Sequence, residues 1–380
     1  MNELDDFTVS EDVVKKKLKS LSITKSPGPD EIHPRLLRES ADVLAKPLSM
    51  IYNSSIRSER LPEQWKDAHI SAIFKKGDRK QPNNYRPISL TSIVRKVLES
   101  IIRDKIINHM EANNLFSNKQ YGFITGRSTT LQLLKVLDDW AEIMDNNGQV
   151  DIIYMDFMKA FDQVPYKRLL QKVKSYGING HILGWITNFL TNRRQRVSVN
   201  GCFSTWGSVT SGIPQGSVLG PLLFIIYIND LPNYTKSPAY LFADDTKLYR
   251  KIANKQDETI LQKDLDALQT WSDKWLLNFH PDKCKVLTVG KRTLQTSYKL
   301  KSRGTIHELD LVHDMKDLGV TVDENLSFET HIQDKVNKAN RTTGMIRRAF
   351  ISLDEEMFLC LFKAFVRPNP RICERGLEPI

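Results

Sequence analysis

Two adjacent aspartates, Asp244 and Asp245, are the residues in this 380-residue chain whose spacing most suggests chemistry. Strand-like residues stand on both sides of the pair, so we expect a hairpin that brings two like charges close together. Such charges are tolerated side by side when a multivalent cation or solvent neutralises them. An Asp-Asp pair alone is more often a solvated turn, so further residues have to decide between the two interpretations.

A third carboxylate, Asp156, follows Val150 to Met155, a run rich in β-branched residues that predicts a buried strand. Three hard oxygen ligands complete a magnesium site. Two magnesium ions held there could activate a primer 3′-hydroxyl and stabilise the departing pyrophosphate during in-line nucleotidyl transfer. The three aspartates are therefore candidate metal ligands and catalytic residues of a template-copying polymerase.

The elements that must position these carboxylates can be read from local patterns. Ser10 can cap a first helix, and Pro221 to Asn229 predicts a buried helix. The dipeptide Asn200-Gly201 predicts a tight hairpin between the strand-like segments Arg196 to Val199 and Cys202 to Val209. The mixed order of strands and helices favours an α+β fold with a central antiparallel sheet. Further helices are expected in the following segments: 34–56, 167–190, 261–275, the region after Phe328, and 355–366.

Composition limits the class of protein and of partner. The net charge of +10 fits an anionic partner such as nucleic acid, although many basic proteins bind none. The four cysteines lack metal-site or disulfide spacing and predict reduced thiols in an intracellular protein, in the cytoplasm or the nucleus. No apolar run approaches the roughly 20 residues that cross a bilayer, so no membrane association is expected. The cysteines are Cys202, Cys284, Cys360 and Cys373.

A loop between the carboxylate-bearing segments, Ser211 to Ser217, contains two glycines that would let the backbone approach a template and an incoming nucleotide closely. The alternative interpretation is that this loop is an ordinary Gly-Pro turn before a core helix and has no part in binding. Segments 84–90, 120–123 and 126–128 precede Asp156 and supply cations suited to triphosphate oxygens. Because these segments come in this order before Asp156 and the loop follows it, an ordinary turn is the weaker interpretation of the loop.

Taken together, these motifs resemble the reverse transcriptases of non-LTR retrotransposons, particularly the jockey-like and chicken-repeat-like groups, from about Ser26 to Arg367. Asp156 to Asp162 is similar to the first palm motif, Gly212 to Gly220 to the nucleotide-pocket loop, and Phe242 to Asp245 to the double-aspartate box. The resemblance implies a right-hand polymerase with fingers, palm and thumb. It also implies an RNA template, a DNA primer, deoxynucleoside triphosphates and two Mg²⁺ ions.

The resemblance also assigns site residues. It implies metal binding by the three aspartates with a contribution from Phe157, and a role for Lys283 as the general acid that protonates pyrophosphate, for which the alternative is a solvated lysine. The nucleotide would be contacted by Arg86, Arg95, Arg127, Phe161, Gln215 and Gly216. Nucleic acid would be contacted by Arg193, Arg194 and Arg196, unless they are exposed hairpin-edge charges, and by the primer-grip turn Leu318-Gly319.

The chain also departs from the family pattern. The unusual positions are Met158, Tyr166, Glu31, His280 and Phe242, and none of them removes a catalytic carboxylate. Met1 stands close to the polymerase segment, so we expect no endonuclease before it in this chain. Residues 369–380 do not resemble the family's continuation, and we therefore expect a truncated copy. The expected organisation is a helical extension at 1–66, fingers and palm at 67–290, a primer grip with a partial thumb at 291–367, and an atypical tail at 368–380.

Three functions stay open at this point. The first is RNA-directed DNA polymerase activity, which the ordered carboxylates and the loop between them favour. The second is a catalytically silent remnant that keeps the fold and binds RNA. An RNA-directed RNA polymerase or maturase would share the carboxylates, but the lysine and primer-grip motifs argue against it.

Overall fold

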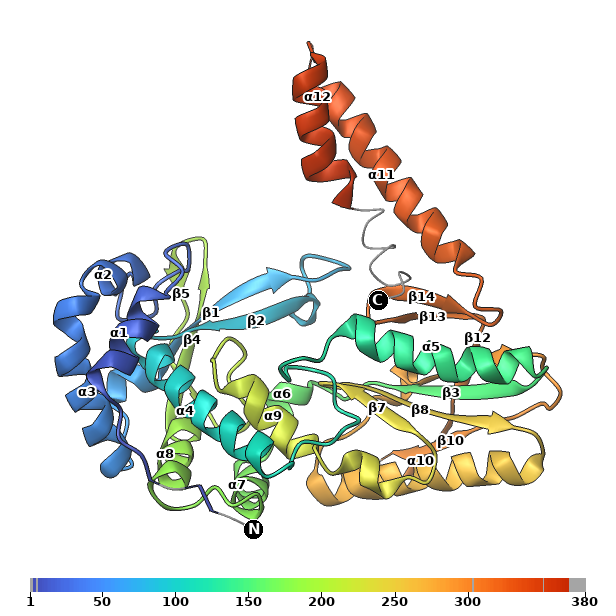
Figure 1. Ribbon diagram of the computed structural model, residues 1–380, viewed down its shortest axis with the longest axis horizontal. Coiled ribbons are helices and arrows are strands. Elements are labelled where there is room, and N and C mark those ends of the chain that lie inside the picture. The colour runs from blue at the N-terminus through green and yellow to red at the C-terminus, as the bar shows by residue number, and fades with distance from the viewer. Residues whose placement is uncertain (1–2, 5, 303, 351, 369–380) are drawn as a thin grey trace. The chain divides into compact units, whose positions relative to one another are not determined.

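The computed structural model describes residues 3–4, 6–302, 304–350 and 352–368 (Figure 1). The chain divides into two compact units. Unit 1 comprises Met1–Ser117, Met158–Asp230 and Trp275–Leu277, and unit 2 comprises Asn118–Phe157, Leu231–Lys274 and Asn278–Ile380. Each unit combines helices with strands, which confirms the expected mixture of α and β structure.

Unit 1 contains a five-stranded sheet in which β2, β1, β4 and β5 follow one another and β6 also pairs with β4. Its strands are β1 (Asp67–Phe74), β2 (Tyr85–Leu90), β4 (Arg193–Val199), β5 (Cys202–Phe203) and β6 (Gly207–Val209). Its α-helices are α1 (Glu11–Lys19), α2 (Pro34–Glu39), α3 (Ala41–Arg57), α4 (Ile93–Ala112), α6 (Ala160–Gln163), α7 (Tyr166–Ser175), α8 (Gly180–Leu190) and α9 (Gly220–Ile228).

Several local predictions for unit 1 are confirmed. Ser10 caps α1 by accepting from the Val13 backbone N–H, which satisfies one of the free amides at the start of the helix. Asn200 and Gly201 have φ values of 49° and 80°, as the tight β4–β5 hairpin requires. The prediction of one strand from Cys202 to Val209 is wrong, because residues 204–206 separate β5 from β6.

Unit 2 is built on a second five-stranded sheet of order β12-β9-β3-β8-β7. The central strand β3 (Gln149–Met155) is antiparallel to both β8 (Asp245–Ile252) and β9 (Lys285–Gly290). Strand β7 (Ala239–Phe242) pairs with β8, and β12 (Asp310–Val312) runs parallel to β9. All seven residues of β3 are buried, which confirms the buried strand that the sequence predicts before Asp156.

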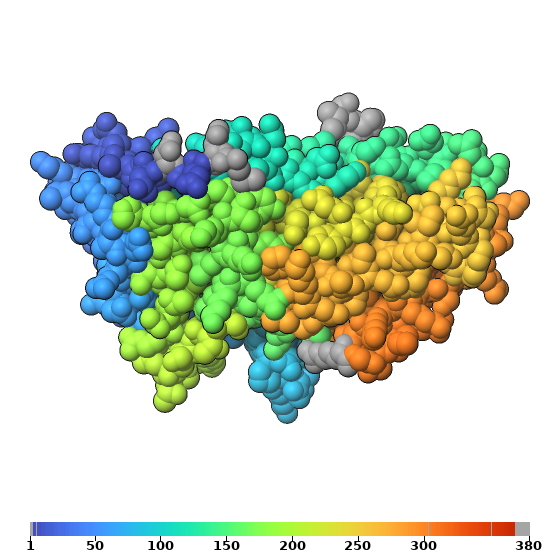
Figure 2. All heavy atoms as spheres, turned by 90° about the horizontal axis from the view of Figure 1, so that it is seen from below, coloured from blue at the N-terminus to red at the C-terminus, as the bar shows by residue number. Residues whose placement is uncertain are grey.

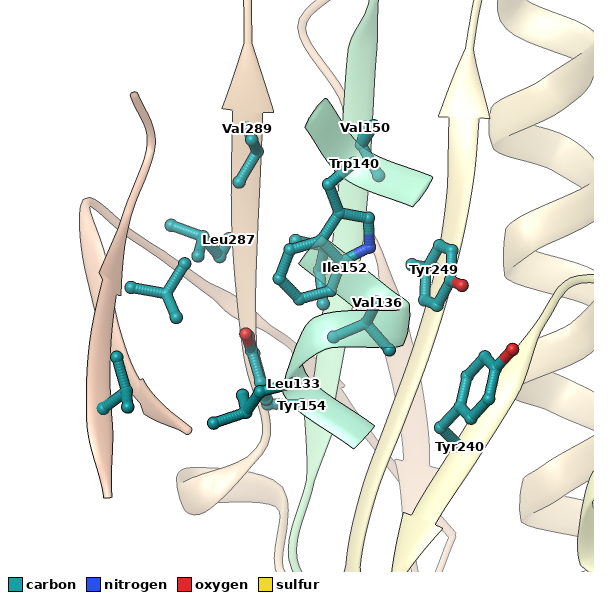
Figure 3. Close-up of a cluster of buried hydrophobic side chains, with 12 residues drawn as sticks. Leu133, Val136, Trp140, Val150, Ile152, Tyr154, Tyr240, Tyr249, Leu287 and Val289 are labelled. Atoms are coloured by element: carbon teal, nitrogen blue, oxygen red, sulfur yellow. The ribbon is translucent and has the colours of Figure 1, made fainter. Parts of the chain in front are cut away.

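Helix α5 (Thr129–Asp145) covers one face of this sheet (Figure 1). Figure 3 shows Trp140 of α5 between side chains of β3, β8 and β9. Its ring meets Tyr249 edge-on at a centroid distance of 5.6 Å. The core on this side of the sheet therefore comes from side chains that are far apart in the sequence.

Helix α10 (Lys255–Trp275) lies on the other side of the sheet in Figure 1, and its apolar residues, such as Leu261 and Leu265, are fully buried. The outward face of α10 is open at the surface in Figure 2, where it is drawn in yellow-orange. Its buried and exposed residues thus follow the amphipathic pattern that the sequence predicts.

The rest of unit 2 consists of two hairpins and a helical segment. The hairpins are β10 (Lys299–Ser302) with β11 (Thr305–Glu308), and β13 (Asp314–Asp317) with β14 (Val320–Asp323). The helices expected after Phe328 and from Glu355 are confirmed as α11 (Glu329–Ala349), α12 (Glu355–Leu361) and a π-turn at Phe362–Val366.

Cys202, Cys284 and Cys360 are free thiols, whereas Cys373 lies outside the described residues. Among the described helices, none combines the length and the apolar character that a membrane span requires.

Removing the Trp140 ring should lower the free energy of unfolding of unit 2 by roughly 3–5 kcal/mol, the usual cost of truncating a buried aromatic side chain to alanine. Urea titration of Trp140→Ala, followed by circular dichroism, measures this change. Lys263→Ala, on the exposed face of α10, is the control and should change it by less than about 0.5 kcal/mol. A loss below about 1 kcal/mol in Trp140→Ala would contradict the assigned core.

Candidate functional site

Strand pairing in unit 2 brings two of the three candidate carboxylates together. The antiparallel pairing of β3 and β8 ends at Met155 opposite Thr246, so Asp156 follows one strand where Asp245 precedes the other. Because side chains alternate along a strand, Asp156 shares a face with Tyr154, and Asp245 shares that face with Lys247. The sheet therefore presents Asp156 and Asp245 side by side at one end.

Asp244 lies in the two-residue turn between β7 and β8, which Phe242 and Asp245 close as a pair. The first turn residue, Ala243, has a φ of 54°, a backbone conformation that usually calls for glycine. Its backbone N–H donates to Gln120 Oε1 at 3.0 Å. A side chain at Gly122 would stand 2.5 Å from the Ala243 nitrogen, so only glycine allows this approach.

The carboxylates influence one another's ionisation. Loss of surrounding water and then the charges of Asp244 and Asp156 raise the pKa of Asp245 to about 6. Asp317 adds to this rise, whereas the ammonium group of Lys247 opposes it. Negative charge is thus concentrated at this end of the sheet.

Lys283 lies beside Asp156. It ends a short 3-10 helix, Pro281–Lys283, and its Nζ is 3.2 Å from Asp156 Oδ1 and 3.3 Å from Oδ2. The segment is anchored by the His280 N–H, which donates to the Asp156 carbonyl at 2.8 Å. The lysine is half exposed, so its ammonium group can reach a ligand of the carboxylates as well as the carboxylates themselves.

The donor set suits a hard cation. Three carboxylates provide oxygen ligands, and the raised pKa of Asp245 reflects negative charge that a divalent cation would neutralise. Within the described residues, no group of three or more His, Cys, Asp or Glu side chains has the spacing to hold a metal ion. The oxygen donors of the three aspartates are of the kind that Mg²⁺ prefers, whereas the spacing of the described side chains is not that of a metal site. The assignment of ions to these residues belongs to the proposal below.

Phe157, the residue after Asp156, is held by aromatic packing. Its ring stacks on Phe279 with a centroid distance of 4.4 Å, and Trp271 lies 6.3 Å away. The side chain is 2% exposed. This packing fixes the backbone that follows Asp156, including the Phe157 carbonyl.

In unit 1, the glycine-containing loop folds against the start of α6. Gln215 Nε2 donates to Asp162 Oδ1 at 3.1 Å, and the Gln215 carbonyl accepts from the Ser89 N–H at 2.7 Å. Gly216 has a φ of 106°, and a Cβ there would lie 2.7 Å from the Ser89 carbonyl oxygen. Phe161 stacks on Phe224 of α9 at 4.5 Å. The loop is therefore a fixed structure rather than a flexible connection.

The three arginines predicted to contact a nucleotide lie in different environments. Arg86 is exposed on β2. Arg127 donates to the Gln120 carbonyl and lies over the ring of Tyr121. Arg95 is 1% exposed, and its guanidinium pairs with Glu99 at 2.7 Å and donates to the Trp65 carbonyl.

Glu99 also accepts from the backbone N–H groups of Val218 and Leu219, just before α9. Arg95 and Glu99 together therefore anchor the loop that leads into α9. A guanidinium buried in this way is not exposed to a nucleotide.

The three arginines of β4 that were predicted to contact nucleic acid differ in how deeply they are buried. Arg193 is 3% exposed, and burial with the charge of Arg95 lowers its pKa to about 9. Arg194 is exposed and makes a two-bond pair with Asp67. Arg196 lies 3.9 Å from the centre of the Phe203 ring and 4.6 Å from that of Trp206. Arg194 and Arg196 are thus the members that an external phosphate can reach.

The turn Leu318-Gly319 joins β13 to β14, with φ values of 48° and 96°. Leu318 packs against the core that Figure 3 shows, and Gly319 is exposed. The turn is therefore anchored on one side and open on the other.

Two positioning residues escaped the sequence analysis. Gln120 lies in one of the segments from which we expected cations, yet its Oε1 accepts from the backbone N–H groups of both Gly122 and Ala243. Lys247 directly follows the Asp-Asp-Thr segment and is 1% exposed, with Asp317 as its partner. Strand β8 also contains Asp245, Thr246, Arg250 and Lys251, so its sequence does not single out Lys247 as the buried cation.

Comparison with known proteins points to one family. The family described as "Reverse transcriptase (RNA-dependent DNA polymerase)" matches residues 73–322. The chain is 31% identical to the "RNA-directed DNA polymerase from mobile element jockey" of Drosophila melanogaster, over 87% of this chain and 36% of that protein. It is 30% identical to the corresponding jockey protein of Drosophila funebris, over 96% of this chain and 41% of that protein. This chain therefore spans about two fifths of the length of these relatives.

Gln120→Leu should make the turn at Ala243 open more often. The substitution leaves two buried backbone N–H groups without an acceptor, and each costs about 1–3 kcal/mol of stability. We expect amide exchange at Ala243 to become roughly tenfold faster or more, measured by hydrogen–deuterium exchange. Gln132→Leu is the matched control. Gln132 is fully buried on α5 and, among the described residues, its side-chain amide has no hydrogen-bond partner. Equal exchange at Ala243 in both variants would contradict the role of Gln120.

Proposed function

Because the chain belongs to the reverse transcriptase (RNA-dependent DNA polymerase) family, we propose that it is the polymerase segment of an RNA-directed DNA polymerase from a non-LTR retrotransposon. The observation that carries the proposal is the β3–β8 register, which sets Asp156 beside Asp245, with Asp244 in the adjoining turn. RNA template, DNA primer and deoxynucleoside triphosphates are the corresponding partners and substrates.

The proposal assigns the subdomains of a right-hand polymerase to this chain. The antiparallel sheet that bears the three aspartates is the palm, and residues 67–290 comprise fingers and palm. Residues 1–66 form the helical extension, and 291–367 comprise the primer grip and a partial thumb. Residues 368–380 form the atypical tail, of which only Pro368 lies within the described residues.

Asp156, Asp244 and Asp245, with the Phe157 carbonyl, are the residues that would hold two Mg²⁺ ions. When bound, these ions supply Lewis-acid activation of the primer 3′-hydroxyl and charge neutralisation at the triphosphate. The protein contributes a fixed carboxylate cluster, which the strand register and the Ala243 turn hold against its own repulsion. That preorganisation is the chain's own part in catalysis.

Lys283 is the proposed general acid. Its ammonium group is 3.2 Å from Asp156 Oδ1, where it could also reach a phosphate that bound metal ions would hold beside the carboxylates. In the reaction, the primer 3′-hydroxyl loses its proton to solvent as its oxygen forms a bond to the α-phosphorus. The bond from that phosphorus to the bridging oxygen breaks, and the lysine proton goes to the departing pyrophosphate. The lysine is then reprotonated from solvent.

For the nucleotide, the resemblance implies contacts with Arg86, Arg127, Phe161, Gln215 and Gly216. The fixed loop around Gln215 and the exposed guanidinium of Arg86 support this assignment. The burial of Arg95 favours the structural role described above instead.

For nucleic acid, the proposal retains Arg194, Arg196 and the turn Leu318-Gly319. Arg196 on its aromatic neighbours offers both a charge for phosphates and a planar surface for bases. The burial of Arg193 favours a structural role for that residue.

Replacing either Asp156 or Asp244 by asparagine should abolish extension of a DNA primer on an RNA template. Loss of a charged metal ligand is expected to cost roughly a thousandfold or more in rate, about 4 kcal/mol of transition-state stabilisation. Chelation with EDTA should stop the wild-type reaction, and added Mg²⁺ should restore it. Gel-based primer extension measures both effects.

Asp266→Asn is the control for this experiment, because Asp266 lies on the exposed face of α10 and its side chain accepts from Gln262 of the same helix. It should extend primers at the wild-type rate. Equal activity of wild type and Asp244→Asn would refute the metal-site assignment. RNA binding without any extension by the wild type would favour a catalytically silent remnant instead.

Lys283→Ala should lower kcat by about 10²- to 10⁴-fold, the usual contribution of a general acid, and should change the KM for nucleotide much less. Single-nucleotide incorporation under quench-flow measures both constants. Lys285→Ala is the matched control, because Lys285 pairs with Asp310 rather than with Asp156. If the two variants behave alike, Lys283 is a solvated lysine and the general acid lies elsewhere.

A further inference from the structure

A buried ion pair connects the catalytic strands of unit 2 to the β13–β14 hairpin. Lys247 Nζ donates to Asp317 Oδ1 at 2.6 Å and to Oδ2 at 2.5 Å. The two side chains are only 2% and 3% exposed. Tyr154 donates its hydroxyl to Asp317 Oδ2 at 3.4 Å. Three groups from three separate segments thus form one enclosed polar cluster.

The cluster lies one step along the strands from the candidate metal ligands. Tyr154 stands directly opposite Lys247 in the β3–β8 pairing. By strand alternation, Tyr154 is on the face that carries Asp156, and Lys247 is on the face that carries Asp245. The carboxylates and the buried pair therefore occupy consecutive rows on the same side of the sheet.

On the hairpin, Asp317 is the last residue before the Leu318-Gly319 turn. It pairs directly with Val320, and Val320 and Val322 belong to the core under α5. Apolar packing alone could hold this hairpin while leaving it free to slide, because such contacts are not directional. A two-bond contact between an ammonium group and a carboxylate fixes one register.

We propose that Lys247 and Asp317 are positioning residues that hold the Leu318-Gly319 turn at a fixed place beside Asp156 and Asp245, so that a primer end lying on the turn meets the carboxylates. This inference rests on the proposed polymerase function. Neither side chain touches the reacting atoms. Their effect is exerted through the docked hairpin.

The burial of Lys247 and Asp317 indicates a geometric role for this ion pair. Taking both charges out of water is costly, and the gain in stability over an apolar pair is small or absent. The other Lys–Asp pairs in unit 2 are much more exposed, with 24% and 73% for Lys285 and Asp310. A buried pair next to the catalytic row is therefore better explained by a need for fixed geometry than by a need for stability.

The test uses the double variant Lys247→Met with Asp317→Asn. It removes both charges, so that no buried charge is left unpaired, and it keeps the side-chain volumes close to those of the wild type. Lys285→Met with Asp310→Asn is the matched control, since it makes the same two substitutions in an exposed pair. Thermal unfolding first establishes that both double variants are folded.

Hydrogen–deuterium exchange then measures the docking of the hairpin without reference to activity. We expect faster exchange in 314–323 of the Lys247/Asp317 variant, by roughly tenfold or more, with β3 and β8 still protected. The control should exchange like the wild type. Unchanged protection of the hairpin in the Lys247/Asp317 variant would overturn the proposal.

Steady-state primer extension measures the consequence for the primer. We expect the KM for primer–template to rise roughly tenfold in the Lys247/Asp317 variant, while the KM for deoxynucleotide stays within about twofold of the wild type. Equal increases in both constants would indicate general damage to the site and overturn the positioning role, as would an unchanged KM for primer–template. An inactive wild type would refute the proposed function and the primer role with it, and the exchange measurement would still decide whether the pair docks the hairpin.

Discussion

Repulsion between carboxylates is the constraint on which the structure of unit 2 depends. Asp156, Asp244 and Asp245 share one end of a sheet, and the pKa of Asp245 rises to about 6 because burial displaces water and because its neighbours are negative. Left to itself, a flexible chain would separate such charges. Backbone pairing prevents this, since the antiparallel contact of β3 with β8 fixes where Asp156 and Asp245 stand. The concentration of negative charge at this end of the sheet is thus a consequence of strand geometry.

The turn that carries Asp244 shows how local sequence serves the same constraint. Ala243 adopts a positive φ that costs a non-glycine residue energy, and the Gln120 side chain compensates by accepting its N–H. Gly122 allows the two segments to approach at a distance that any side chain would prevent. The Gln-Tyr-Gly-Phe segment therefore supports the aspartates through the Gln120 side chain and the close approach at Gly122, although no member of it is charged.

Much of this arrangement could be predicted because its signals are local. A β-branched run before Asp156, an Asn-Gly turn and an N-terminal serine each specify structure within a few residues. Burial of charge is different, because it depends on segments that meet only in the fold. Arg95 and Arg193 look like phosphate ligands in a basic sequence, and both are enclosed by unit 1. Likewise, nothing near Lys247 reveals a partner seventy residues away at Asp317.

The buried pair also bears on how the register of the sheet is chosen. A slip of one residue between β3 and β8 would turn Asp245 and Lys247 to the opposite face together. Asp317 would then be enclosed without a cation, which costs about 3–5 kcal/mol in addition to the apolar contacts that the slip would break. The register that pairs Lys247 with Asp317 is the one that sets Asp245 beside Asp156. A buried ion pair and the adjacent carboxylates are thus placed by a single alignment of two strands.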